Sequence, residues 1–518
     1  MPNQGAGGTP NPWVPWLARL TMATAALPVV AGPNGLLMPS LVPGHYDHQR
    51  LLVVASLVTL ALLPLLSRSM RSVNGTFWTG LPVWARAAIG LFFALGLVSA
   101  ARSPSPMPAF LEWGTLTLAV GAVVAVAGAR WQSAKEGDAW FLALTLGGVA
   151  LYTGKFLAMY LPTVRVPEVT IFWGSPFFHF ANVRFLNQFQ SWSLPLVAAA
   201  TLLAGQWSRT LRALLALLGG FWWALLFATG GRGALIAALL STLFVVLFFR
   251  GKALQWLGTT LLLVGLGGAL YFLLFYLPGG TPGFERAIDK SGSADSQRLI
   301  LWSAALKAGL AHPFLGVGPM QLALDPEIAT HPHNALLQLF AEWGLPATLA
   351  GVVLVLGGVL SWAHQWSGTE WHVPTQLPAW EGALPPALTA ALFAGLGHGM
   401  VSGTMVMPMS QIMAVLVVGW LLGVHFARRK ASPQPEVPRR RDAHGAFLAA
   451  FGLLGITALV PGFSFSLTGL PEAHETYSKQ EMRFHPRFWL QGDLCRPPWP
   501  SPVSKENCAA PQQEGTLR

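Results

Sequence analysis

Apolar stretches of about 20 residues recur along the whole chain, and short polar connections separate them. A helix of that length rises about 1.5 Å per residue and therefore crosses the roughly 30 Å hydrocarbon core of a bilayer. Inside a bilayer every backbone N–H and C=O group needs a partner within the protein, and a helix supplies those partners. The pattern predicts an all-α polytopic membrane protein.

We predict about 12–13 transmembrane helices. The longest connection, residues 278–332, lies between the ninth and tenth of them. Leu299, Trp302 and Leu306 recur at helical spacing in this loop and predict an ordered amphipathic helix. Thirteen spans can be delimited, and they cover residues 13–31, 50–67, 84–101, 108–129, 138–161, 190–207, 211–229, 232–249, 254–277, 344–363, 385–404, 409–427 and 445–468.

Basic residues are distributed unequally between the two sets of connections. If the N-terminus is cytoplasmic, the cytoplasmic connections carry fifteen Lys and Arg residues and the short outer loops carry five. Membrane proteins keep Lys and Arg on the cytoplasmic side. The asymmetry predicts that the large loop, 278–332, faces the outer side, which is the periplasm in a bacterial inner membrane.

Composition agrees with this class of protein. The chain is 53% hydrophobic and only 10% charged, and its mean hydropathy is +0.50. The formal charge of +11 reflects the basic cytoplasmic connections, so we expect membrane lipids and no nucleic acid as partners.

Two regions are predicted. Residues 1–468, including the loop 278–332, form the transmembrane domain, and residues 469–518 form a periplasmic, proline-rich tail. Both cysteines of the chain, Cys495 and Cys508, lie in this tail. An oxidising compartment suits a paired arrangement, so we expect a disulfide there and no catalytic role for the tail.

Three short segments carry the candidate chemistry. The stretch HPHNALLQLFAEWGLPA closes the large loop, and in it His333 and Asn334 are followed by nine residues and then Gly344. Upstream, TGGRGA places Arg232 at the start of a predicted helix. The segment SADSQRLILWSAALKAGLAHPFLGVGPMQ carries Arg298 within the large loop.

In this order, the segments resemble the O-antigen ligase and O-antigen polymerase superfamily, which includes protein O-oligosaccharyltransferases. The resemblance covers roughly residues 185–350, and Ala347 stands where the family usually has a glycine. It implies a GT-C-like glycosyltransferase that works at the periplasmic face without a metal or other cofactor. The implied donor is a glycan on undecaprenyl pyrophosphate. The implied acceptor is the lipid A core for O-antigen ligation, which we favour, or another glycan or a protein hydroxyl.

The residue types fit such a reaction by themselves. Arginine presents a fork of donors that matches phosphate oxygens, so Arg232 and Arg298 are candidate ligands of the pyrophosphate. Glycines on both sides of Arg232, at the start of a helix, let an anion approach backbone N–H groups. His333 also lies near a helix N-terminus, which favours a neutral imidazole that can accept a proton from the acceptor hydroxyl.

Further candidates are weaker, and plainer interpretations stay open. Asn334 is a candidate for orienting His333 or the sugar, and Arg184 and His331 are further candidate substrate contacts. Each of these residues also fits a structural or interfacial role. His331 and His333 lack a third ligand at a spacing typical of zinc, so no metal site is predicted. His398 is explained equally well by glycine-rich helix packing.

Two other classes of protein remain as alternatives. A transporter or flippase of lipid-linked glycans usually shows internal repeats and broken helices near the midplane. No convincing repeat is present, and the candidate residues gather at one face of the membrane. A purely structural membrane scaffold leaves Arg232, Arg298 and His333 unexplained.

Overall fold

The computed structural model describes residues 13–39, 42, 44–163, 179–278, 293–324, 331–366, 379–429, 438–479 and 487–489. Within these ranges the chain is almost entirely helical and forms no β-strand. The elements, in order, are α1 Trp13–Ala31, α2 His45–Leu66, α3 Arg68–Gly80, α4 Val83–Arg102, α5 Pro106–Thr163, α6 Val183–Ala204, α7 Arg209–Thr229, α8 Arg232–Phe249, η1 Arg250–Ala253, α9 Leu254–Tyr271, η2 Phe272–Tyr276, α11 Ser293–Ala311, η3 Gln321–Leu324, α12 Ala335–Trp366, α13 Ala379–Gly399, α14 Pro408–Arg429 and α15 Pro438–Lys479.

The predicted fold class, an all-α polytopic membrane protein, is confirmed. In the described part of the chain, nine helical stretches are long and apolar enough to cross a membrane. One of them, Arg232–Tyr276, contains two of the predicted spans. The predicted spans at 13–31, 190–207 and 385–404 fall on α1, α6 and α13, which are helical but not among the nine.

Helix α5 contains two candidate spans. Its stretches Pro106–Ser133 and Glu136–Pro162 are each long enough to cross a membrane. The Arg130 guanidinium donates to both carboxylate oxygens of Asp138, at 2.9 and 2.7 Å. This ion pair is mostly buried and ties together the two stretches where they meet.

Helix α6 falls short of the apolar composition of a membrane span because its buried side is polar. Most of its residues are buried, between α7 on one side and α13 on the other. Gln190 donates to the Trp222 carbonyl at 2.8 Å, and the Trp222 indole donates to Ser193 Oγ at 3.0 Å. Hydrogen bonds of this kind hold polar residues inside a helix bundle.

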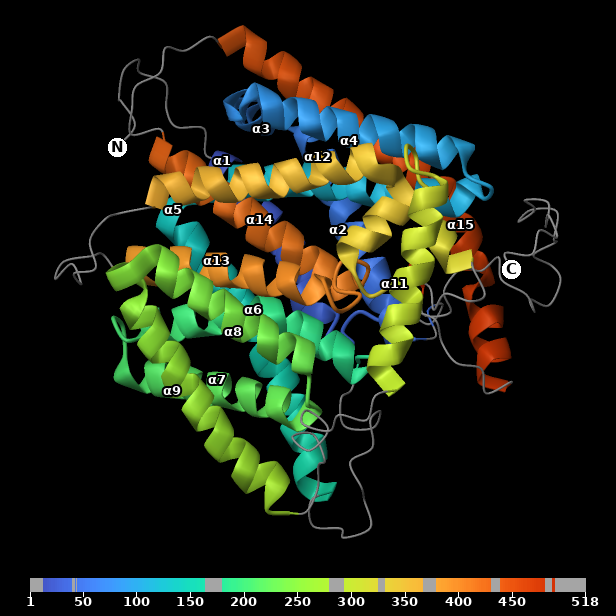
Figure 1. The fold of residues 1–518 in the computed structure, drawn as a ribbon. Helices are drawn as coiled ribbons and strands as arrows, with labels where there is room; N and C mark the ends of the chain where they lie inside the picture. Colours follow the sequence, from blue (N-terminus) through green and yellow to red (C-terminus); the bar gives the residue numbers. More distant parts are fainter. Residues whose placement is uncertain are drawn as a thin grey trace.

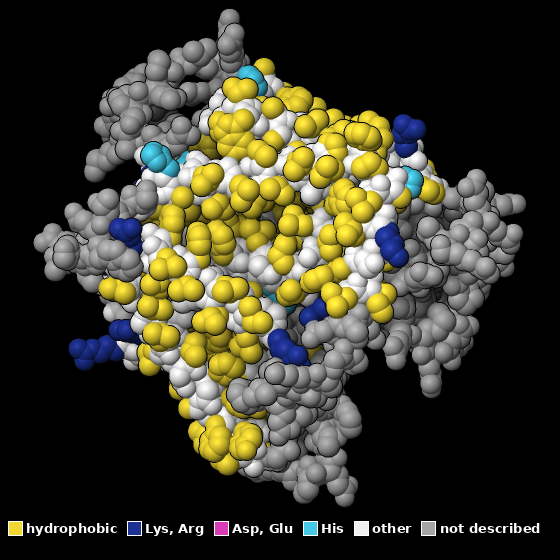
Figure 2. Space-filling view, viewed as in Figure 1, with side chains coloured by type: hydrophobic (Ala, Val, Ile, Leu, Met, Phe, Trp, Pro, Cys, Tyr) yellow, Lys and Arg dark blue, Asp and Glu magenta, His cyan; other side chains and the backbone are white. Residues whose placement is uncertain are grey.

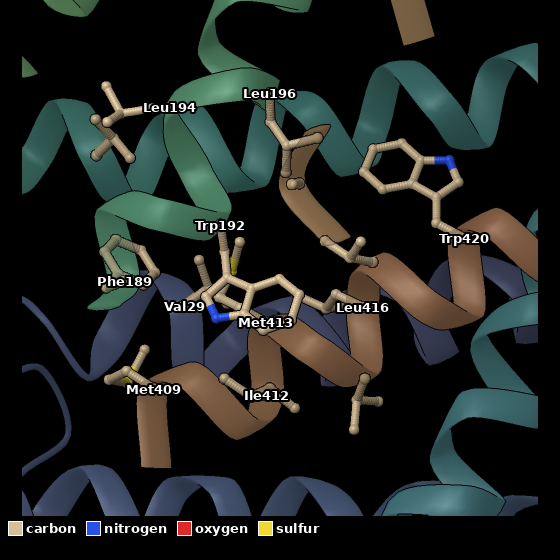
Figure 3. Close-up of a cluster of buried hydrophobic side chains, with 14 of the residues drawn as sticks. Val29, Phe189, Trp192, Leu194, Leu196, Met409, Ile412, Met413, Leu416 and Trp420 are labelled. Carbon is tan, nitrogen blue, oxygen red and sulfur yellow. The ribbon is translucent and has the colours of Figure 1, made fainter. Parts of the chain in front are cut away.

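The largest apolar core surrounds α6 and α14. Figure 3 shows Phe189 and Trp192 of α6 facing Met409, Ile412, Met413 and Leu416 of α14. The Trp192 indole also donates to Ser410 Oγ at 2.8 Å, which fixes the rotation of one helix against the other. This core holds rigid the two helices on which part of the site is built.

The long helices run across the view in Figure 1, and α11 lies across them at one end of the bundle. Figure 2 shows hydrophobic side chains over most of the same face, with Lys and Arg at its margins and in a small group in its lower half. Such a broad apolar surface is what a bilayer covers.

Helix α11 confirms the ordered helix predicted in the large loop, but the predicted buried face was wrong. Leu299 and Leu306 are exposed, whereas Leu301 and Ala305 are buried against α12. Small alanine side chains at this contact let the two helices approach closely, and the larger leucines are left outside.

Candidate active site

The His-Asn pair forms the start of α12. The Asn334 side-chain Oδ1 accepts from the Leu337 N–H at 3.0 Å, and the Asn334 carbonyl accepts from the Gln338 N–H at 2.9 Å. Asn334 is therefore the N-cap of the helix, a position that asparagine favours strongly. The hypothesis that Asn334 orients His333 or the sugar stays a prediction beside this structural role.

His333 adopts a strained backbone conformation just ahead of this cap. Its φ angle is 54°, in the left-handed region that few residues other than glycine adopt. Strain of this kind gathers at functional sites, where the surrounding structure holds it in place. The His333 ring meets the His331 ring edge-on, with 4.3 Å between centroids.

The chain before His333 is anchored from two sides. The Trp302 indole of α11 donates to the Pro332 carbonyl at 2.9 Å. The His331 ring lies against Gly403, where an added Cβ would come within 2.2 Å of Nε2. His331 is 3% exposed, so it is a packed neighbour of His333 with little access to a substrate.

The glycine nine residues after Asn334 has a packing role. Gly344 interrupts α12 with φ 80° and ψ 170°. An added Cβ there would lie 2.4 Å from the Phe314 carbonyl oxygen. The segment around Phe314 is held to this interruption of α12 by three backbone hydrogen bonds. The Val317 and Gly318 N–H groups donate to the Ala341 and Glu342 carbonyls at 2.8 and 3.0 Å. The Leu345 N–H donates to the Pro313 carbonyl at 2.7 Å.

The segment 313–318 and the segment 333–344 are therefore two halves of one contact, which we call the α11–α12 joint. Gly316 has φ 68°, and a Cβ there would lie 2.3 Å from the Glu342 carbonyl carbon. Gly316 and Gly344 stand at the closest approaches of the two backbones, where a Cβ would collide with the facing chain. The joint fixes the first turns of α12, and with them His333, relative to α11 and Arg298.

Two arginines lie near His333. Burial, together with the charges of Arg184 and Arg298, lowers the pKa of His333 to about 4. The imidazole is therefore neutral at neutral pH, as predicted, although burial and two cations cause this rather than the helix dipole. Arg184 begins α6, where the Asn182 side chain accepts from its N–H at 2.9 Å, and Arg298 comes from α11.

Arg232 is the first residue of α8. Gly230 takes φ 61° and Gly231 follows, so the chain turns sharply into the helix. A Cβ at Gly231 would meet Asn187 Oδ1 at 2.5 Å, and one at Gly233 would meet the His398 ring at 3.1 Å. The Arg232 side chain itself is exposed.

His398 links the start of α8 to α6 and lies within electrostatic range of Arg298. It is buried, and its Nδ1 is 2.8 Å from Ser191 Oγ. Nearby, the Asn187 amide donates to Thr229 Oγ1 at 2.7 Å. The sequence analysis gave His398 no clear role and overlooked Asn187 and Ser191. Asn187 and Ser191 are four residues apart and therefore share a face of α6. Polar residues on one face of an apolar segment indicate a buried or functional position, and this was the signal in the sequence.

A cavity of about 440 Å³ begins beside the cap of α12. Its walls are mainly apolar and come from α4, α5, α12, α13 and the chain that follows α13. It extends along α12 from Ala335 to Leu356, and Leu336 and Leu356 are 44% and 56% exposed. The cavity therefore connects the neighbourhood of His333 with the outer apolar surface, and Figure 2 shows a hollow near the middle of that surface.

Four charged side chains line the same cavity, and the sequence analysis did not select any of them. They are Arg50, Glu112, Glu342 and Arg487. A charged residue inside an apolar segment is by itself a reason to expect a functional site. Glu112 and Glu342 could therefore have been selected as candidates from the sequence. Arg50, which the topology assigned to a short outer loop, is 1% exposed within α2.

The predicted tail is partly within the fold. Helix α15 continues past residue 468 to Lys479, and Arg487, Phe488 and Trp489 are buried. Cys495 and Cys508 lie outside the described residues, so their disulfide stays a prediction. Among the described residues, no group of three or more His, Cys, Asp or Glu side chains is arranged to hold a metal ion.

The fold and the site define a multi-pass membrane protein with a histidine and several arginines gathered at one end of its helices. Residues 196–352 match the family described as O-antigen ligase. This segment contains Arg232, Arg298, His333 and the Gly344 bend, and the match supports the O-antigen ligase and polymerase superfamily. The resemblance inferred from the sequence is confirmed. A search of curated proteins found no match to the chain.

Proposed function

We propose that the protein transfers a glycan from undecaprenyl pyrophosphate to an acceptor hydroxyl at the periplasmic face of the bacterial inner membrane. The observation that carries the proposal is the position of His333, held at the start of α12 within electrostatic range of Arg184 and Arg298. The membership of residues 196–352 in the O-antigen ligase family supports the reaction class.

The chemistry needs one base and one stabilised leaving group. The acceptor oxygen forms a bond to the anomeric carbon, the bond from that carbon to the phosphate oxygen breaks, and the acceptor proton moves to the His333 imidazole. A neutral imidazole is able to accept this proton, and such a base contributes about 10²–10⁴-fold to the rate.

The arginines have the complementary task. As the carbon–oxygen bond breaks, negative charge grows on the pyrophosphate, and Arg184 and Arg298 can stabilise it with charge-assisted hydrogen bonds. Arg232, exposed at the start of α8, is the third candidate for this contact. Bound pyrophosphate also offsets the two cationic charges near His333, so the imidazole becomes a stronger base when the donor is present.

The cavity along α12 suits the hydrocarbon part of a lipid substrate. Its mainly apolar walls start at Ala335, two residues after His333, and reach Leu356 on the outer surface. A chain lying there would place a headgroup beside the histidine. We assign this cavity to the isoprenoid chain of the donor.

The identity of the acceptor is the most specific part of the proposal. We propose the lipid A core, with another glycan or a protein hydroxyl as the alternatives. A transporter of lipid-linked glycans, the alternative from another class, would not need a neutral histidine between cations at one end of the bundle.

Reconstitution of the purified protein in vesicles tests the proposal. Vesicles would contain a defined undecaprenyl-pyrophosphate glycan, and each of the three acceptors would be added separately. We expect release of undecaprenyl pyrophosphate in step with glycosylation of one acceptor. Movement of the intact donor between leaflets, without release of its carrier, would show a flippase and refute the transferase.

A further inference from the structure

The short C-terminal segment 487–489 lies between four helices. The Arg487 carbonyl accepts from the Tyr46 hydroxyl at 2.6 Å, and the Phe488 carbonyl accepts from Arg50 Nε at 2.8 Å. The Trp489 ring contacts the Phe463 ring of α15, with centroids 5.6 Å apart. The segment is thus fixed through its backbone to α2 and through a side chain to α15.

The Arg487 side chain joins two further helices. Its Nη2 donates to Glu112 of α5 at 2.7 Å and to Glu342 of α12 at 2.6 Å. Arg487 is 1% exposed and Glu342 is fully buried. Removing one partner from a buried ion pair leaves the other charge uncompensated, so this contact strongly constrains the helices that it joins.

Glu342 transmits this contact to the joint that fixes His333. Its Oε1 accepts from the Leu322 N–H of η3 at 3.3 Å, and its carbonyl accepts from the Gly318 N–H at 3.0 Å. Gly318 and Leu322 belong to the segment that leads from α11 towards His331. Arg487 also lies within electrostatic range of His331 itself.

We infer that Arg487 is a positioning residue for the active site, holding Glu342 and through it the α11–α12 joint that aligns His333. The inference rests on the proposed function. It gives this late segment of the chain a task in the reaction, because Arg487, 145 residues after Glu342, acts on the site through Glu342. A misalignment of about 1 Å is enough to reduce a rate about 10²-fold.

The test compares two buried arginines. In Arg487→Gln, we expect kcat per folded molecule to fall about 10- to 100-fold, while the donor KM changes less than about twofold. Arg130→Gln is the matched control, because Arg130 pairs with Asp138 inside α5 and contacts nothing at the site. It should lower thermal stability and leave kcat per folded molecule unchanged.

A conservative variant separates charge from packing. Both carboxylates contact the same nitrogen of Arg487, so the ammonium of Arg487→Lys can approach both of them. We expect Arg487→Lys to recover most of the lost kcat. In the double variant Arg487→Gln/Glu342→Gln, the loss should be smaller than the product of the two single losses, because the residues act as one unit.

Hydrogen exchange gives a readout that does not depend on glycosyl transfer. Measured by mass spectrometry, Arg487→Gln should exchange faster than wild type in residues 314–322 and 331–345, and Arg130→Gln should not. If the wild-type protein transfers no glycan, the proposed function fails while exchange still tests the positioning role. Wild-type exchange in both segments, or wild-type kcat per folded Arg487→Gln, refutes that role. If Arg487→Gln does not fold, Glu112→Gln and Glu342→Gln are measured in the same two ways, and wild-type values for both again refute it.

Discussion

Replacing Gly344 with alanine tests the joint between α11 and α12. The new Cβ would lie 2.4 Å from the Phe314 carbonyl oxygen and 2.7 Å from the Leu315 nitrogen. Both neighbours are backbone atoms, so the collision cannot be relieved by a rotamer change. The residue would also have to adopt φ 80° and ψ 170°, a region that is essentially reserved for glycine.

The magnitude follows from these contacts. Forcing alanine into this backbone region costs about 1–3 kcal/mol. Relief by separation of the two segments would break two or more of the three backbone bonds across the joint, each of which contributes about 1 kcal/mol. We therefore expect the free energy of unfolding to fall by about 3–6 kcal/mol, together with a loss of transfer activity because His333 is displaced.

The assay is unfolding by SDS titration in mixed detergent micelles, followed by tryptophan fluorescence. Gly358→Ala is the matched control on the same helix, because a Cβ there meets no atom within 4 Å. Its helical position should make it neutral or slightly stabilising. If Gly344→Ala unfolds at the same point as Gly358→Ala, the joint does not constrain α12 and the reasoning is wrong.

Three further predictions concern the residues around His333. The lowered pKa of His333 predicts that kcat/KM falls on the acid side near pH 4, where the imidazole becomes protonated. The acid limb of kcat should lie at higher pH, because bound pyrophosphate offsets the charges of the arginines. Acid limbs at pH 6.5 in both profiles would contradict this. Arg298→Lys and Arg184→Lys should each weaken donor binding in a filter assay, and the double variant should bind the donor more weakly than either single variant. The control is Arg209→Lys, at the exposed start of α7. Unchanged donor affinity in both single variants would remove the two residues from the phosphate site. Asn334→Ala should lower the free energy of unfolding by about 1 kcal/mol, because the helix loses its cap. Asn334→Asp should keep the cap and move the acid limb of the pH profile to higher pH, because the new carboxylate raises the pKa of His333. An unmoved acid limb in Asn334→Asp would show that residue 334 does not influence the charge of His333.

Local pattern was enough to predict the helices. Apolar runs of bilayer length identified the spans, because each run forms its own helix whatever its neighbours are. The prediction failed to recognise α6 as a polar helix at the centre of the fold, since its glutamines and serines find partners only in the folded bundle. The helix in the large loop was found, but its buried face depends on the alanines that meet α12.

Long-range contacts account for what the sequence did not reveal. Arg487 lies in a proline-rich, polar stretch that is typical of an unstructured tail, and its partners are 145 and 375 residues away. Gly344 was recognised by its spacing, yet its reason, the close approach of Phe314, appears only when α11 lies beside α12. Arg184 was a minor candidate because charge alone does not tell which loop arginine lies near His333.

The central claim is that His333 accepts the acceptor proton during transfer from the lipid carrier. Single-turnover measurements on purified wild type and His333→Ala, each loaded with the same undecaprenyl-pyrophosphate glycan before the acceptor is added, test it most directly. We predict that both proteins bind the donor with similar affinity and that wild type releases the carrier about 10²–10⁴-fold faster. Equal rates of carrier release from the two loaded proteins would contradict the account.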